Sequence, residues 1–131
     1  MRFLLLFQLD EARWAGLPEA EREALMAGCD RYAQEMVASG HARHCAALHP
    51  SSTATTVRLQ EGRRVITDGP FAETKEVLAG YQVIECRNLD EALDIAARFP
   101  PLRIGASVEV RPIRAEGGAG STSPASSASS V

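Results

Sequence analysis

The sequence lacks the features that mark membrane-spanning, disulfide-linked and nucleic-acid-binding proteins. No apolar run approaches the roughly 20 residues that cross a bilayer. The three cysteines (Cys29, Cys45 and Cys86) have unmatched spacings, which argues against a disulfide framework and favours reduced thiols. The formal net charge of −3 provides no basic excess for contacting nucleic acid. We therefore expect a cytoplasmic protein with no membrane partner and no direct nucleic-acid partner.

The N-terminus is apolar only briefly. Residues 1–7 (MRFLLLF) are followed by Gln8 and then by Asp10 and Glu11, with no small-residue cleavage site. A secretory signal needs a hydrophobic region of roughly 7–15 residues. The pattern therefore predicts a buried first strand and not a signal peptide.

Motifs of several enzyme classes are missing as well. The sequence has no Gly-rich phosphate loop, nucleophile elbow or dinucleotide-binding fingerprint. His41, His44 and His49 are residue types that zinc accepts, but their spacing matches no ligand motif. Cys45 and Cys86 stand outside any CxxC pair, so we expect both to be buried structural thiols. We expect neither a metal nor a cofactor.

What is present is typical of one ordinary globular domain. The chain has 131 residues, of which 45% are hydrophobic and 24% are charged. From about residue 116 the composition falls to Gly, Ala, Ser, Thr and Pro, which cannot form a core. We expect a folded domain over residues 1–115 and a disordered tail over 116–131.

Hydrophobic periodicity within residues 1–115 predicts strands and two helices in alternation. We expect strands over residues 3–9, 42–48, 53–60, 63–67, 78–86 and 107–113, the middle pair forming a hairpin at Glu61-Gly62. The first helix should run from Pro18 to Ser39 and the second from Asn88 to the Pro100-Pro101 pair. The predicted buried stripes are Leu25, Cys29, Tyr32 and Met36 on the first helix, and Leu89, Ala92, Leu93, Ala96 and Ala97 on the second.

This order of elements predicts an α+β two-layer sandwich of ferredoxin-like type, in which helices cover one face of an antiparallel sheet. Alternation along the strands should direct Ile84, Cys86, Val108 and Val110 toward the helices. The residues expected on the other face are Tyr81, Val83, Glu85, Glu109 and Arg111. An uncovered face with this lining favours a homodimer, of the dimeric α+β barrel type, that encloses a pocket.

The densest chemistry lies in residues 68–76 (DGPFAETKE), which we call the signature segment. Asp68-Gly69-Pro70 is a turn signal, and Phe71 is expected to bury and anchor the loop. Two interpretations remain open. The charged side chains are either a solvated loop with little energetic effect or a rigidly placed acid–base group beside a lysine.

The signature segment resembles that of the DGPF branch of the YCII-related family. Residues 54–58 (ATTVR), Gly80-Tyr81 and residues 108–112 (VEVRP) are also similar to that family. The resemblance implies the ferredoxin-like fold and a homodimer. Members of this branch are often encoded beside, or fused to, extracytoplasmic-function sigma factors. Some members of the wider family carry a His–Asp pair that is proposed as catalytic, with the histidine associated with the first helix, but this chain has no histidine between Pro18 and Ser39.

Two functional hypotheses follow. In the first, the protein is a binding or regulatory module that acts with an extracytoplasmic-function sigma factor. In the second, it is a cofactor-independent enzyme acting on a small organic molecule in the dimer cleft. There Asp68 would be the acid–base group and Lys75 an anion anchor. The further candidate binding residues are Phe71, Glu73, Glu76, Tyr81 and Arg111.

Overall fold

The structure is a computed structural model that describes residues 1–114. The predicted tail over 116–131 lies outside the described residues. The elements are β1 (Arg2–Leu9), α1 (Glu11–Ala15), α2 (Glu19–Ala38), β2 (Ala42–Ala47), η1 (Ser51–Thr53), β3 (Thr55–Gln60), β4 (Arg63–Asp68), β5 (Val77–Glu85), α3 (Leu89–Ala96), η2 (Pro100–Ile104) and β6 (Ser107–Pro112).

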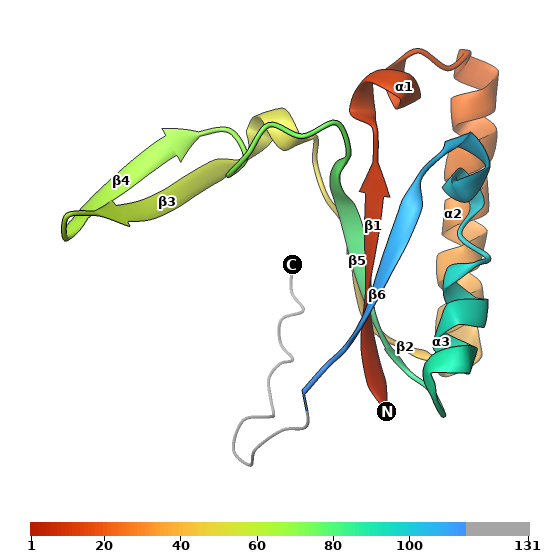
Figure 1. Cartoon of the computed structure of the whole chain (residues 1–131). Helices are drawn as coiled ribbons and strands as arrows, with labels where there is room; N and C mark the ends of the chain where they lie inside the picture. Colours follow the sequence, from red (N-terminus) through yellow and green to blue (C-terminus); the bar gives the residue numbers. More distant parts are fainter. Residues whose placement is uncertain (115–131) are drawn as a thin grey trace.

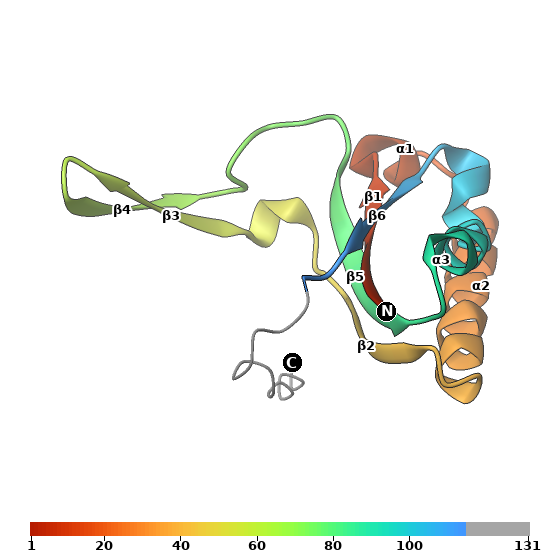
Figure 2. The ribbon, with the colours of Figure 1, turned by 60° about the horizontal axis from the view of Figure 1, so that its bottom comes forward.

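Four strands form one antiparallel sheet in the order β2-β5-β1-β6. Both long helices, α2 and α3, lie on the same side of this sheet (Figures 1 and 2). The predicted ferredoxin-like α+β sandwich is confirmed. We call the side of the sheet without helices the open face.

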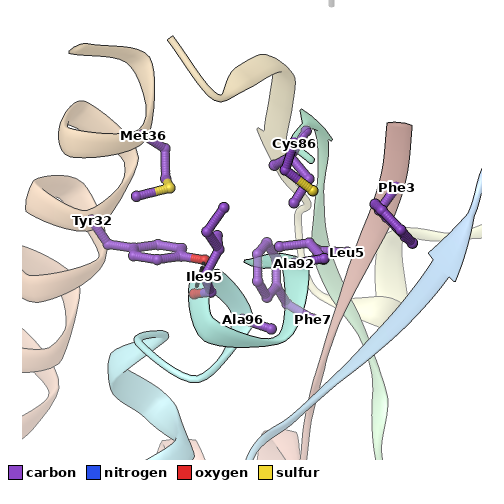
Figure 3. Close-up of a cluster of buried hydrophobic side chains, with 10 residues drawn as sticks. Phe3, Leu5, Phe7, Tyr32, Met36, Cys86, Ala92, Ile95 and Ala96 are labelled. Atoms are coloured by element: carbon purple, nitrogen blue, oxygen red, sulfur yellow. Dashed lines mark hydrogen bonds between the residues drawn. The ribbon is translucent and has the colours of Figure 1, made fainter. Parts of the chain in front are cut away.

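The core lies between the sheet and the helices, and alternation along β1 builds its floor (Figure 3). Phe3, Leu5 and Phe7 are all buried, and each contributes about 1.5–3 kcal/mol relative to an exposed position. Phe7 stacks on Phe99 with 4.3 Å between ring centroids. The Tyr32 hydroxyl donates to the backbone oxygen of Ile95 at 2.9 Å, which ties α2 to α3. As predicted, Ile84, Cys86, Val108 and Val110 pack on this side.

The two predicted helical stripes differ in accuracy. On α2, Leu25, Tyr32 and Met36 are buried, whereas Cys29 is only half-buried, and burial raises the pKa of its thiol. On α3, the prediction for Leu89, Leu93 and Ala97 was wrong, since these three are exposed. Ala92 and Ala96 are buried as predicted, and Ile95, which was not predicted, is buried with them, because the buried stripe continues into Phe99.

The strands β3 and β4 form a separate two-stranded sheet that projects from the body of the protein, the hairpin arm (Figure 1). The hairpin itself was predicted, and its turn is at Glu61-Gly62, with φ angles of 52° and 80°. Positive φ at both central positions is the turn geometry that matches the twist of paired strands. Thr53, predicted to begin the first arm strand, ends the short helix η1 instead.

Two local features were not predicted or were predicted wrongly. The short helix α1 was missed, although Asp10 caps it by accepting hydrogen bonds from the amides of Ala12 and Arg13. Cys45 is exposed and not buried, because β2 is an edge strand, whereas Cys86 is buried as expected.

Within residues 1–114, no helix combines the length and apolar character that crossing a bilayer requires.

The edge strand β2 approaches β5 very closely at one point. A Cβ atom on Gly80 would lie 2.8 Å from the backbone oxygen of Ala46, which is closer than real side chains come. The strands pair there with Ala47 opposite Gly80 and Ala46 opposite Tyr81. A glycine at position 80 is therefore what permits this approach.

A set of hydrogen bonds joins the end of α2 to the start of α3. The His41 ring lies 2.8 Å from Ser39 Oγ and 3.2 Å from Glu91 Oε2. Glu91 Oε1 also accepts the backbone N–H of Arg87 at 2.7 Å, and the Asn88 side chain caps α3 at the Glu91 amide. The Arg87 amide is the main reason that the pKa of Glu91 is lowered, and the His41 ring acts in the same direction.

A lowered carboxyl pKa makes Glu91 a pH-dependent stabiliser. The contribution is fully present above the ordinary glutamate pKa of about 4.3 and is lost as the pH falls through the lower folded value. We predict that Glu91→Gln lowers the Tm by a few degrees at neutral pH and that the difference from wild type shrinks as the pH falls below about 4. Thermal melts across this range test it, with exposed Asp94→Asn on the same helix as control. A Tm difference between Glu91→Gln and wild type that is equally large at neutral and at acidic pH would contradict the prediction.

Candidate functional site

The signature segment connects the hairpin arm to β5, and its first residues form a constrained turn. Asp68 is the last residue of β4 and is exposed. Gly69 has a φ of 103°, in the left-handed region that favours glycine, and its N–H donates to the backbone oxygen of Ala54 at 2.7 Å. The predicted turn is therefore present. The Asp68 carboxylate accepts no hydrogen bond from residues 1–114, so the turn is held by the glycine and the backbone.

Contacts from two strands fix the rest of the segment. Thr56 Oγ1 donates to the Gly69 oxygen at 2.8 Å, and Arg58 Nη2 donates to the Phe71 oxygen at 2.7 Å. At the other end, Ser107 Oγ donates to Glu76 Oε1 at 3.1 Å. The segment is thus tied to β3 at its start and to β6 at its end.

Phe71 does not anchor the loop as predicted. Its side chain is 75% exposed, because the backbone and not the ring is held by the arm. The prediction that this ring buries within its own chain was wrong. An aromatic ring on a fixed loop instead becomes an apolar contact available to another molecule.

Part of the signature segment lines a cavity of about 380 Å³ at the start of α1. Its charged lining residues are Asp10, Glu11, Glu73 and Lys75. Glu11 is already engaged, because its carboxylate accepts the amide of Ser51 at 2.8 Å and the hydroxyl of Ser51 at 2.6 Å. Asp10 caps α1. Glu73 and Lys75 have no partner within residues 1–114, so they are the charges that this cavity presents to a ligand.

The open face holds the two other predicted binding residues. Tyr81 lies beside His44, with its hydroxyl 2.8 Å from His44 Nε2. Arg111 faces Glu109 on the same strand, at 3.7 Å between Nε and Oε2, in an exposed pair. In the strand register, Tyr81 pairs with Leu6, and Leu6 in turn pairs with Glu109. Tyr81 and Arg111 therefore share one surface, with apolar β1 side chains between them.

The predicted site residues thus occupy separate places in one chain. Glu73 and Lys75 line the cavity, Tyr81 and Arg111 lie on the open face, and Glu76 bonds to Ser107. Asp68 and Phe71 are exposed near the base of the arm and do not line the cavity. Within the described residues, Asp68 and Lys75 are not brought together in one cavity.

Sequence reasoning missed the α1 side of the cavity. Asp10 directly follows a strand and precedes a short polar–apolar stretch, which is a helix-start signal that could have placed it. The pairing of Glu11 with Ser51 carried no local signal, since the two residues are 40 positions apart.

The three histidines do not form a cluster: His41 contacts Glu91, His44 contacts Tyr81, and His49 is exposed after β2. No group of three or more His, Cys, Asp or Glu residues suited to a metal is found in the described part of the chain.

Comparison with known proteins places this geometry in a family. A family model for the YCII-related domain matches residues 1–115. An uncharacterised protein of Rhizobium meliloti (strain 1021) is 36% identical over 114 residues, which cover 86% of this chain and 92% of that relative. Neither comparison names a substrate or a reaction. On the strength of both matches, the chain belongs to the YCII-related domain family.

Proposed function

We propose that the protein is a homodimeric binding module with a regulatory role, and that its target is an extracytoplasmic-function sigma factor. The observation that carries this proposal is the hairpin arm. In the arm register Val57 pairs with Ile66, and Leu59 follows two residues later on the same face. These side chains are 60%, 55% and 74% exposed, respectively.

An isolated two-stranded hairpin with an exposed apolar face is marginally stable in water. A projecting arm of this kind supports a role in docking, because a partner that covers the face removes apolar surface from water. Phe71, on the signature segment, is a further exposed apolar side chain. The choice of a sigma factor as target is supported by the family resemblance, in which such proteins are neighbours or fusion partners.

The arrangement of charges also favours binding over catalysis. A general acid–base site needs its groups within hydrogen-bond reach of one reacting molecule. In one chain, the cavity contains Lys75 and Glu73 but not Asp68. The signature segment then acts as a rigid connector that fixes the direction of the arm.

We predict that Leu59→Ser and Phe71→Ala each weaken binding of a purified extracytoplasmic-function sigma factor from the same genome by about ten-fold or more. Calorimetry or fluorescence anisotropy measures the change. The control is Met26→Ser, since Met26 is a comparably exposed apolar residue, at 57%, on α2, a helix that lies far from the arm (Figure 1). Loss of affinity in the control as large as in the arm variants, or no binding by wild type, would contradict the proposal.

The homodimer is proposed to form through the open face. Leu4 and Leu6 occupy the centre of this face on β1, and Val83 lies opposite Leu4 on β5. Polar pairs flank this apolar strip, with His44 and Tyr81 on one side and Glu109 and Arg111 on the other. An apolar centre with a polar rim is the usual anatomy of a specific interface.

Val83→Asp is expected to weaken the dimer by at least about ten-fold, because the interface would bury an unpaired carboxylate in each subunit. Light scattering at micromolar concentration measures the mass. Leu93→Asp on the exposed side of α3 is the matched control and should leave the mass unchanged. A wild-type protein that is monomeric under these conditions would exclude the dimer.

A second candidate function has support from the 380 Å³ cavity. In that case the protein is a cofactor-independent enzyme for a small organic molecule bound in the dimer cleft. Lys75 would hold an anionic group of the substrate, Asp68 would exchange a proton with it, and Tyr81 or Arg111 would orient it. Because these groups lie apart from one another within a single chain, this function requires residues of the second subunit to complete the site.

The enzymatic candidate predicts that Asp68→Asn preserves the melting temperature and abolishes turnover of a metabolite. Mass spectrometry of a small-molecule extract incubated with the protein identifies the consumed compound. Asp94→Asn serves as the control for loss of an exposed carboxylate. If wild type and Asp68→Asn consume the same compounds at the same rate, Asp68 is not an acid–base group.

A further inference from the structure

A second cavity lies on the helical side of the protein, between α2 and the segment that runs from the end of α3 into η2. Its volume is about 430 Å³, a size that accommodates a small organic molecule. Gly28 allows these two elements to approach, because a Cβ at this position would lie 3.3 Å from the Pro100 ring. The cavity shares no lining residue with the cavity of the signature segment. The helix α2, which forms one of its walls, lies on the side of the sheet opposite the open face (Figure 2).

The lining of this groove is strongly positive. Arg31, Arg98 and Arg103 contribute three guanidinium groups, and Glu35 is the one carboxylate among the residues that line it. None of these guanidinium groups makes an ion pair or hydrogen bond within residues 1–114. Arg98 follows the C-terminus of α3, where a positive charge is favourable without any ligand. That explanation does not extend to Arg31, which projects from the middle of α2.

The floor of the groove is apolar and held in place by the core. Tyr32 and Phe99 both line it, with ring centroids 6.1 Å apart, and Phe99 is fixed from behind by stacking on Phe7. The Tyr32 hydroxyl is already used by the Ile95 oxygen, so the ring contributes its carbon surface. Burial raises the pKa of Tyr32 to about 12, and the nearby charge of Arg98 acts in the opposite direction. The charge of Arg98 therefore acts on Tyr32, a residue that lines the groove.

We propose that this groove binds a small phosphate monoester with an apolar body. A guanidinium presents parallel N–H donors that match phosphate oxygens, and a phosphate monoester carries about −1.5 to −2 charges at neutral pH. Three arginines opposed by one glutamate leave two positive charges, which this dianion balances and a monocarboxylate does not. The apolar body lies on Tyr32, Phe99 and Pro100. This inference does not depend on the proposed sigma-factor binding or on the dimer.

Phenyl phosphate is the probe, and the full chain is titrated by two-dimensional amide NMR. We expect saturable shifts at Gly28, Arg31 and Phe99, with a Kd of about 1 mM or tighter. Inorganic phosphate, which lacks the apolar body, and benzoate, which carries one charge, should each bind about ten-fold more weakly. The affinity should fall as salt is raised.

Arg31→Gln combined with Arg98→Gln should weaken phenyl phosphate by about ten-fold or more. Arg43→Gln combined with Arg63→Gln removes two exposed arginines elsewhere and should leave the affinity unchanged. Glu35→Gln should tighten binding, because it removes the opposing carboxylate. This gain of affinity tests the site even if the double variant is unstable.

Four results would each overturn the proposal. They are the absence of saturable binding by phenyl phosphate, shifts confined to residues outside the groove, equal affinity for inorganic phosphate or benzoate, and equal weakening by the control pair.

Discussion

The structure depends on the alternation of side chains along β1. This strand lies at the interior of the sheet, paired with β5 on one side and β6 on the other. Its odd-numbered residues Phe3, Leu5 and Phe7 form the floor of the core. Its even-numbered residues Leu4 and Leu6 form the centre of the open face. Within one chain the helices cover only the odd-numbered side, so the apolar side chains of the other side have no helix over them.

The two sides of the sheet therefore differ in structure. The helical side holds a closed core whose aromatic residues Phe7, Tyr32 and Phe99 contact one another. Two of these aromatic residues, Tyr32 and Phe99, also form the floor of the arginine-lined groove. The open face and the arm present apolar side chains without a partner in the described residues, and the signature segment connects them. The surfaces proposed to bind partners are thus all attached to the same four-stranded sheet.

Much of the fold was predictable because it rests on local patterns. The strands, the long α2 and the hairpin turn at Glu61-Gly62 follow from periodicity and turn residues. Errors arose where the outcome depends on distant contacts. The exposure of Leu93 on α3 is decided by where Phe99 packs, and the exposure of Cys45 by the position of β2 at the sheet edge. The candidate site was less predictable. Sequence proximity suggested that Asp68 and Lys75 act together, whereas the turn at Gly69 directs them to different surroundings.

The close approach at Gly80 restricts the register in which the edge strand β2 can pair with β5 during folding. Edge strands are prone to pair out of step, because one neighbour alone fixes them. A slip of one residue would put Ala79 or Tyr81 where Gly80 now meets the Ala46 carbonyl, at a separation that no side chain tolerates. Because glycine has no side chain, Gly80 permits the observed register of β2, and a register shifted by one residue is sterically excluded. The same alignment places His44 beside Tyr81.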